Sequence, residues 1–231
     1  DFDLAAGFCF TEGLLLGSPV EEIRYCATGS AVETHFNVVD VGTDGSAPAP
    51  TPRLTASTSS CGWCGSDQLD QLIDRLSPLP PSDPIDLDVL LSLPERMAEH
   101  QPLHTATGAV HAAAIFTGRG DIVVAREDVG RHNAVDKVIG ARLLADGLPA
   151  AGQGLFVSSR ASVEIVQKAW AAGCSTLVAV SAPTALAVDA ARRAGMTLLG
   201  FVRGGTANVY APERLPAPEP GTADRAVGDG R

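Results

Sequence analysis

From Val110 onward, short apolar segments alternate with segments of helical periodicity, and no other feature of the chain constrains its fold as strongly. Two apolar runs on either side of Gly118–Arg119–Gly120 predict a β-hairpin. Helices and strands then follow in turn, which is typical of right-handed crossovers and a largely parallel sheet covered by helices. The expected strands are 110–116, 122–126, 154–158, 176–181 and 197–203, and the expected helices are 132–145, 162–172 and 184–194.

The N-terminal part of the chain does not show this alternation, and it predicts a smaller α+β subdomain. Its pattern indicates one helix, two strands rich in β-branched residues, a Gly/Pro-rich loop and two further helices. The Pro-dense segment Ser77–Pro84 marks a boundary before the last of these helices. In order, the expected elements are the helix 3–16, the strands 21–28 and 31–41, the loop 40–53 and the helices 68–76 and 87–100.

These segments predict three parts: an N-terminal subdomain over 1–84, an α/β core over 85–215 and a disordered tail over 216–231. A chain of 231 residues is long enough for one domain with a good core or for two small ones. Residue 1 is Asp rather than Met and a helix begins almost at once, so we expect part of the N-terminus to be missing.

Net charge and cysteine content argue against several function classes. The formal charge is −10 and no basic run offsets it, so nucleic-acid binding is not expected. No apolar run approaches the ~20 residues that span a bilayer, so we expect no membrane insertion. The five cysteines are odd in number and no signal peptide is recognisable, which indicates free thiols in a reducing cytosol.

Reactive chemistry is expected in the loop Ser57–Gly65, where Cys61 and Cys64 are separated by two residues and glycines are interleaved. Glycine allows the backbone to turn tightly and to present both sulfurs outward. The thiols of a C-x-x-C pair near a helix start have lowered pKa values, so that the thiolate attacks sulfur or binds metal. Two other interpretations stay open, namely half of a zinc site and a pair of small buried hydrophobic residues.

A zinc site would need two more ligands, for which His100 and His104 are the candidates. The gap between the cysteine pair and the histidine pair is much longer than the usual ~12–15 residues. Pro102 also interrupts any helix between the two histidines. The spacing therefore disfavours a structural metal, and none is expected.

Polar turns follow four of the expected strands, at the carboxyl edge where α/β sheets bind their ligands. Hydroxyl groups, arginines and free N–H groups at helix N-termini there bind phosphate well. Ordinary helix capping explains each turn alone, but four such turns at one edge favour a pocket for an anionic ligand. The turns are 126–133, 158–162, 181–184 and 203–206, with Arg131, His132 and Arg160 as candidate ligand contacts.

The order hairpin, helix, strand, helix, strand also matches the layout of zinc deaminases, although their catalytic residues are missing. Those enzymes need H-x-E on the first helix and P-C-x-x-C at the next. Here Ala134 stands where the carboxylate would follow His132, and Ser159 and Ser162 replace both thiolates. A deaminase-like core without metal therefore fits the sequence, whereas a working deaminase does not. Serine hydrolysis is not expected either, because no G-x-S-x-G motif is present.

Isolated histidines and cysteines elsewhere carry less information. His111 lies within an apolar run and is expected to be a hydrogen-bonded core residue rather than a catalyst. Cys9, Cys26 and Cys174 are expected to be buried residues without a chemical role.

Several long motifs make the chain similar to a known family. The segment AREDVGRHNAVDKVIG, which ends at Gly140, resembles the formate dehydrogenase accessory sulfurtransferase (FdhD) family. The similarity continues through VSSRASVEIVQKA, VAVSAPTALAV, LLGFVRG and NVYAPERL, and upstream through DLAAGFCFTEGLL and SSCGWCG. It covers nearly everything from residue 1 to about residue 215.

The resemblance implies a fold, an activity and a set of site residues. Family members resemble metal-free relatives of the cytidine-deaminase fold, here a hairpin followed by alternating helices and strands. They pass sulfur from a cysteine desulfurase to the molybdenum cofactor, as bis-molybdopterin guanine dinucleotide, before it enters apo formate dehydrogenase. By resemblance, Cys61 carries the persulfide and Cys64 is its partner. The segment expected to hold the guanine dinucleotide is Phe201, Val202, Arg203, Gly204, Gly205 and Thr206.

Two departures from the family pattern are visible. Members commonly have a basic residue where Thr206 stands, so Arg131 and Arg160 are expected to contribute more of the phosphate contacts. The family's chain also begins well before the helix at residue 3, so we expect an N-terminal strand segment to be absent here.

The leading hypothesis is a cytoplasmic, homodimeric sulfurtransferase that acts on the cofactor as its cargo. The second is a cofactor-binding chaperone without sulfur transfer, and Cys61→Ala separates it from the first. The third is a zinc-stabilised binding domain, which metal analysis of chelator-free protein would test.

Overall fold

A computed structural model of the protein describes residues 1–25, 38–49, 78–216 and 227–229. The predicted reactive loop with Cys61 and Cys64, the predicted helix 68–76 and most of the second predicted strand, 31–41, lie outside these ranges. The fold is mixed α/β, and no helix in the described ranges is long and apolar enough to cross a bilayer.

A seven-stranded mixed sheet organises the core, in the order β4-β3-β5-β6-β7-β8-β9. Its centre, β5 to β7, is parallel, whereas β3 pairs antiparallel with β4 and with β5, and β7 pairs antiparallel with β8. The strands are β3 (His111–Phe116), β4 (Ile122–Asp128), β5 (Gly154–Val157), β6 (Thr176–Ala179), β7 (Thr197–Arg203), β8 (Thr206–Ala211) and β9 (Val227–Asp229). The expected hairpin and the alternation after it are confirmed, but the sheet is less parallel than predicted.

The C-terminal half of the sheet explains this difference. The prediction of Thr197–Arg203 as the last strand was wrong, because Gly204 and Gly205 adopt φ values of +53° and +72° and reverse the chain into β8. Glycine adopts this left-handed conformation without a steric penalty, and paired glycines favour a tight hairpin. In the stretch expected to be a disordered tail, Val227–Asp229 pairs in parallel with β8 as β9.

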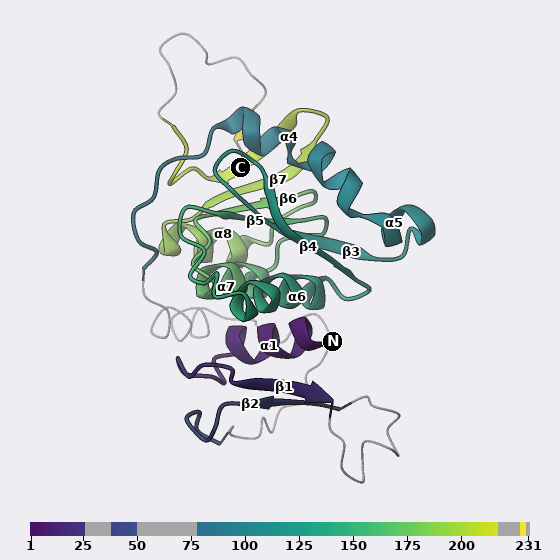
Figure 1. Ribbon diagram of the computed structural model, residues 1–231. Helices are drawn as coiled ribbons and strands as arrows, with labels where there is room; N and C mark the ends of the chain where they lie inside the picture. Colours follow the sequence, from purple (N-terminus) through teal and green to yellow (C-terminus); the bar gives the residue numbers. More distant parts are fainter. Residues whose placement is uncertain (26–37, 50–77, 217–226, 230–231) are drawn as a thin grey trace.

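Helices cover both faces of the sheet (Figure 1). One face carries α6 (Arg131–Leu144), α7 (Val163–Ala171) and α8 (Ala185–Ala194), and the other carries α4 (Leu87–Met97) with the 3₁₀ turn η1 (Ala98–His100) and α5 (Pro102–Thr107). Alternate residues of β5 serve the two cores, since Leu155 and Val157 pack under α6 and α7 while Phe156 packs under α4. Strands buried on both faces read as continuous apolar runs, which is why they are recognisable from the sequence.

The short helix α5 was not predicted. The predicted helix 87–100 is α4 followed by η1, and Pro102 then begins a new helix rather than merely ending the old one. Proline is well suited to the first turn of a helix, where its missing N–H costs no hydrogen bond. His100 and His104 therefore lie on different helical segments.

The N-terminal helix α1 (Phe2–Thr11) packs across α6 with almost no separation between the backbones. A Cβ atom on Gly7 would lie 1.8 Å from the carbonyl oxygen of Asp136, and one on Gly140 would lie 1.8 Å from that of Asp3. The helix is shorter than the predicted 3–16, because Gly13 follows with φ +72° and ends it. The two-stranded antiparallel sheet of β1 (Glu22–Tyr25) and β2 (Val39–Gly42) lies beyond α1 (Figure 1). The end of the predicted strand 31–41 is therefore a strand, and it extends by one residue, Gly42, into the predicted loop 40–53.

Gly140→Ala is expected to lower the free energy of unfolding by about 2 kcal/mol or more, because the new methyl group overpacks the α1–α6 contact. Alanine has the higher helix propensity by about 1 kcal/mol, so a loss of stability would come from the contact itself. Urea unfolding measures it, with Gly118→Ala as the control, since a Cβ there meets nothing within 4 Å. A variant as stable as the wild type would contradict the close packing.

Candidate functional site

The four polar turns predicted to meet at the carboxyl edge of the sheet are neighbours in the structure. The turn after β6 is bonded to the turn after β5, with the Ser181 N–H donating to the Ser159 carbonyl at 3.4 Å and the Thr184 N–H donating to the Ala161 carbonyl at 3.0 Å. The Phe201 N–H in turn donates to the Ser181 carbonyl at 3.2 Å. The parallel register of β5, β6 and β7 brings these strand ends to one edge.

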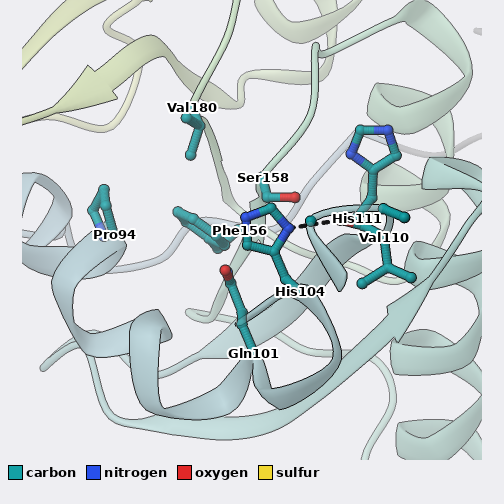
Figure 2. Close-up of a pocket in the computed structure, with 10 residues that line it drawn as sticks. Pro94, Gln101, His104, Val110, His111, Phe156, Ser158 and Val180 are labelled. Carbon is teal, nitrogen blue, oxygen red and sulfur yellow. Dashed lines mark hydrogen bonds between the residues drawn. The ribbon is translucent and has the colours of Figure 1, made fainter. Parts of the chain in front are cut away.

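A pocket of about 420 Å³ opens at this edge, on the face of the sheet that α4 and α5 cover (Figure 2). Phe156, Ser158 and Val180 line it from the ends of β5 and β6, and Pro94, Gln101 and His104 line it from the helical side. Sequence reasoning did not find this pocket, because α5 was not predicted. His111 lies at its rim as a partly buried residue, so it is not the enclosed core histidine that was expected.

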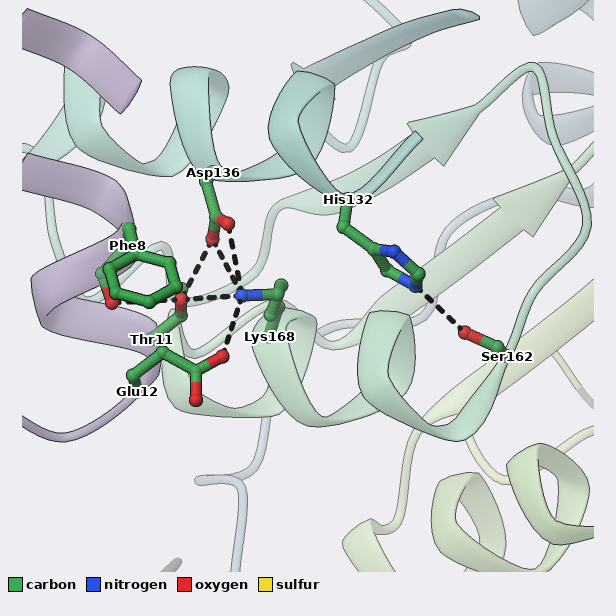
Figure 3. A network of polar contacts seen from close by, with 7 residues as sticks. All are labelled: Phe8, Thr11, Glu12, His132, Asp136, Ser162 and Lys168. Atoms are coloured by element: carbon green, nitrogen blue, oxygen red, sulfur yellow. Dashed lines mark hydrogen bonds and ion pairs between the residues drawn. The ribbon is translucent and has the colours of Figure 1, made fainter. Parts of the chain in front are cut away.

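On the opposite face, the N-terminal ends of α6 and α7 lie side by side. The His132 ring and the Ser162 hydroxyl join them, with Nε2 and Oγ 3.3 Å apart (Figure 3). Neither helix has a side-chain N-cap hydrogen bond, so backbone N–H groups of both first turns are available to an anion. Burial and then the charge of Arg131 lower the pKa of His132, so this imidazole is neutral at neutral pH.

Asp128 fixes the backbone that leads into α6. Its Oδ1 accepts hydrogen bonds from the Gly130 N–H at 2.8 Å and from Asn133 Nδ2 at 3.2 Å, and its Oδ2 pairs with Lys137 Nζ at 2.6 Å. Burial acts to raise the pKa of Asp128, but the hydrogen bonds and the charge of Lys137 outweigh it and the pKa is lowered. Within the motif EDVGRHN, the ionised carboxylate of Asp128 therefore holds the backbone at the start of α6 in position.

Arg131 is the first residue of α6, and its side chain is incompletely satisfied. Its Nε is buried and has no hydrogen-bond partner among the described residues. Its charge acts on His111 as well as on His132 and contributes to the lowered pKa of both. Since a buried donor without a partner costs free energy, this atom favours a bound acceptor beside the helix end.

The segment expected to hold the guanine dinucleotide is the β7–β8 turn. Phe201 adopts φ +55° and is 37% exposed, and Arg203, Gly204, Gly205 and Thr206 are exposed as well. Val202 is fully buried under α4, so its side chain anchors the turn and only its backbone can reach a ligand. The Thr206 hydroxyl donates to the Arg203 carbonyl at 3.0 Å. Arg160 is exposed on the turn that follows β5.

One charged network lies behind the site and was not predicted (Figure 3). Lys168 of α7 is buried, and its Nζ contacts Asp136 Oδ1 at 2.8 Å and Oδ2 at 3.0 Å, Thr11 Oγ1 at 2.9 Å and Glu12 Oε1 at 3.2 Å. Burial raises the pKa of Asp136 in spite of the Lys168 charge. Asp136 lies one helical turn after His132, so this network ties α1 to the two helices that form the polar edge.

The described cysteines are poor sulfur carriers. Burial raises the pKa of the Cys9 thiol, and it raises that of Cys174, which is fully buried, to about 12. Sulfur carriers react as thiolates that a partner can reach. Cys174 is buried as expected, whereas Cys9 is only partly buried. Cys26, Cys61 and Cys64, which lie outside the described ranges, are left as the candidates.

A metal site does not form among the described residues. No group of three or more His, Cys, Asp and Glu side chains with the geometry to hold a metal occurs within 1–25, 38–49, 78–216 and 227–229. The His104 ring instead contacts the backbone, with its Nδ1 3.2 Å from the Val110 carbonyl oxygen. Cys61 and Cys64 lie outside these ranges, so the structure does not test the alternative of a zinc site formed by Cys61, Cys64, His100 and His104.

Known proteins are similar to this chain over more than nine tenths of its length. The family model described as the FdhD/NarQ family matches residues 1–216. A protein named sulfur carrier protein FdhD from Streptomyces avermitilis is 46% identical over 222 residues, which cover 92% of this chain and 78% of that protein. The protein of the same name from Anaeromyxobacter dehalogenans is 42% identical over 229 residues, covering 93% and 79%.

A solved structure is similar as well. It is that of a candidate formate dehydrogenase accessory protein from Desulfotalea psychrophila, with a TM-score of 0.70 and 25% sequence identity. The similarity covers 93% of this chain and 80% of that one, so the mixed sheet and the helices on both of its faces recur in a distant sequence.

Proposed function

The chain belongs to the FdhD/NarQ family, and from this we propose that it is a sulfurtransferase that loads the molybdenum cofactor with sulfur before the cofactor enters formate dehydrogenase. The names of the relatives, sulfur carrier protein FdhD, support sulfur transfer at this general level. In this proposal Cys61 carries the sulfur, Cys64 assists it, and bis-molybdopterin guanine dinucleotide is the cargo. No metal ion is part of the proposed site.

The loading step of the proposed sulfur transfer needs no external oxidant or reductant. The Cys61 thiolate attacks the outer sulfur of a cysteine desulfurase persulfide, so that a new S–S bond forms at Cys61 and the desulfurase cysteine leaves as a thiolate. In the delivery step the Cys64 thiolate attacks the Cys61 sulfur, which forms a Cys61–Cys64 disulfide and releases the outer sulfur as sulfide to the cofactor. A cellular dithiol then reduces the disulfide and restores both thiols.

The observation that best supports a bound anionic dinucleotide is the row of polar turns at the carboxyl edge. The uncapped ends of α6 and α7, the buried Nε of Arg131 and the exposed Arg160 and Arg203 supply donors and positive charge in a protein of net charge −10. Phosphate oxygens accept from such groups in charge-assisted hydrogen bonds. We therefore assign the phosphates of the cargo to this edge, between Arg131 and the Phe201–Thr206 turn.

Arg131→Gln is expected to weaken the binding of guanosine diphosphate at least about tenfold, the effect of losing one charge-assisted hydrogen bond. Calorimetric titration of the purified chain measures the affinity. Arg119→Gln is the matched control, because Arg119 is exposed at the β3–β4 turn, at the far end of β4 from α6. Equal affinity in the wild type and Arg131→Gln would remove Arg131 from the site, and no binding by the wild type would contradict a dinucleotide cargo.

A cofactor-binding chaperone without sulfur transfer is the second candidate. The observation that favours it is that the described site offers a pocket and phosphate donors, while both described thiols have raised pKa values. The sulfurtransferase needs Cys61, whereas the chaperone does not. Formate dehydrogenase that still matures with Cys61→Ala would therefore favour the chaperone, and loss of maturation would favour the sulfurtransferase.

We further propose that the core is a metal-free relative of the cytidine-deaminase fold. In support, His132 and Ser162 lie 3.3 Å apart, at the positions where that fold holds two of its zinc ligands, and Ala134 replaces the catalytic carboxylate. We also propose that the protein acts in the cytoplasm as a homodimer, and that its partners are a cysteine desulfurase and apo formate dehydrogenase.

A further inference from the structure

The buried ion pair of Lys168 and Asp136 has no role in the sulfur chemistry proposed above. Both side chains are almost completely buried, and Lys168 Nζ contacts the two carboxylate oxygens of Asp136 at 2.8 and 3.0 Å. Burying two charges costs so much desolvation energy that apolar residues of similar size often stabilise a fold equally well. Stability alone therefore does not explain why these two helices meet through charges.

The pair joins the two helices whose N-terminal ends belong to the polar edge. Asp136 is the sixth residue of α6 and Lys168 is the sixth residue of α7, so each lies about 8 Å along the axis from the first residue of its helix. The two helices follow β4 and β5, which both pair antiparallel with β3, and they therefore run in the same direction. An ion pair at equal depth keeps the two helix starts level with each other.

The contact at the helix starts themselves is weaker. His132 Nε2 and Ser162 Oγ lie 3.3 Å apart, which is long for a hydrogen bond, and the imidazole is neutral. Charge-assisted hydrogen bonds such as those of Lys168 are shorter and roughly twice as strong. The ion pair is therefore the stronger link between the first turns of α6 and α7.

The helix α1 encloses the pair from a third side, as Figure 3 shows. Thr11 Oγ1 donates to Asp136 Oδ1 at 2.7 Å and accepts from Lys168 Nζ at 2.9 Å. Glu12 Oε1 lies 3.2 Å from the same Nζ, and the centroid of the Phe8 ring lies 5.8 Å from it. Because an ammonium group has three N–H donors and here meets four carboxylate or hydroxyl oxygens, its orientation is fixed.

Phosphate binding depends on how the two helix starts are placed. Neither α6 nor α7 has a side-chain N-cap hydrogen bond, so the N–H groups of both first turns are available to an anion. Arg131, with its unpartnered Nε, is the first residue of α6 and moves with that helix. Donors on two separate helices act on one ligand only if they are held within about 0.5 Å of the productive geometry.

We propose that Lys168 and Asp136 are positioning residues for phosphate binding, and that their ion pair sets the spacing of the first turns of α6 and α7 that the phosphates of the cargo require. The two buried side chains lie behind the helix starts, and they act through the backbone N–H groups and Arg131. This inference rests on the proposed function, which assigns the phosphates to this edge.

The double variant Lys168→Met/Asp136→Leu separates positioning from stability. Apolar residues of similar size should preserve the folded core, which urea unfolding of the full chain checks. Calorimetric titration is expected to show that this variant binds guanosine diphosphate at least about tenfold more weakly than the wild type, because the donors of the two helices are displaced from each other.

Ile139→Val is the matched control. Ile139 is buried in the core on α6, and the loss of one methyl group lowers stability while the ion pair stays intact. Its affinity for guanosine diphosphate is expected to stay within about twofold of the wild type. An equal loss of affinity in Ile139→Val and in the double variant would trace the effect to general stability and would overturn the proposal.

Arg131→Gln in the background of the double variant provides a readout that a purely structural ion pair would not change. In the otherwise native chain this substitution removes a donor that is held at the phosphate. Once the helix starts are displaced, the same substitution is expected to weaken binding by less than about threefold. Equal losses in the two backgrounds would show that the ion pair and the helix start act independently, and would overturn the proposal.

The titrations also keep the two proposals apart. If the wild type binds guanosine diphosphate and the double variant binds it equally well, the positioning role is overturned and the proposed cargo stands. If the wild type does not bind it, the assignment of the cargo fails and the positioning role fails with it. A double variant that does not fold would overturn the positioning role as well, because the pair would then be needed for the core itself.

Discussion

When Cys61→Ala is the only accessory protein in the cell, formate dehydrogenase activity is expected to fall by more than about 100-fold, because the variant lacks the nucleophile that we propose holds the sulfur. The described thiols cannot replace it. Burial raises the pKa of Cys9 and raises that of Cys174 to about 12, so neither is a reactive thiolate near neutral pH.

The experiment compares wild type, Cys61→Ala and Cys9→Ala in cells without their own accessory protein, and measures formate oxidation in extracts. Cys9→Ala is the control for the loss of a thiol as such, and it should support nearly normal activity. Normal activity with Cys61→Ala would contradict sulfur transfer through this residue and would favour the cofactor-binding chaperone.

Lys168→Met is expected to lower the free energy of unfolding by about 3–5 kcal/mol, the usual cost of leaving one partner of a buried ion pair alone. The side chains of Lys168 and Asp136 are only 5% and 3% exposed. Methionine matches the lysine stem in shape but leaves the Asp136 carboxylate without its counter-charge, and the Thr11 hydroxyl loses a donor. Urea unfolding measures the loss.

The double variant Lys168→Met/Asp136→Leu distinguishes a lost charge partner from lost packing. Because two apolar residues of similar size often replace a buried ion pair at little cost, the double variant should recover most of the stability that the single variant loses. If the single variant loses less than about 1 kcal/mol, the network is worth no more than a surface ion pair, and Lys168 does not hold α1 against α6 and α7.

The core could be predicted from the sequence because β3, β5 and β6 are almost wholly buried and because α7 and α8 are amphipathic. The segments 154–158, 176–181 and 197–203 each contain the strand observed, and α6, α7 and α8 begin within one residue of their predicted starts. The meeting of the polar turns followed from topology alone, since parallel strands end at one edge.

The elements that were not predicted are short, and they depend on residues that are compatible with two different local structures. Pro102 can end a helix or begin one, and the Glu127 carboxylate at the N-terminus of α5 favours the second. Gly204–Gly205 is a recognisable hairpin signal, and it could have led to β8. The pocket was beyond prediction, because it joins side chains from α4, α5 and the ends of two strands that are far apart in the chain.

Lys168 shows a different limit of sequence reasoning. A lysine on a helix is usually solvated, and nothing in the segment VEIVQKAWA marks it as buried. Its burial results from α1, which lies against α6 through Gly7 and Gly140 and brings Thr11 and Glu12 to its ammonium group. Only the tertiary contact of three helices separates this lysine from an exposed one.

The most direct test of sulfur transfer is the intact mass of the purified chain after incubation with a cysteine desulfurase and cysteine. The wild type is expected to gain the mass of one sulfur atom, a thiol reductant is expected to remove this gain, and Cys61→Ala is expected to show none. An unchanged wild-type mass in the presence of active desulfurase, or an equal gain on Cys61→Ala, would contradict the account.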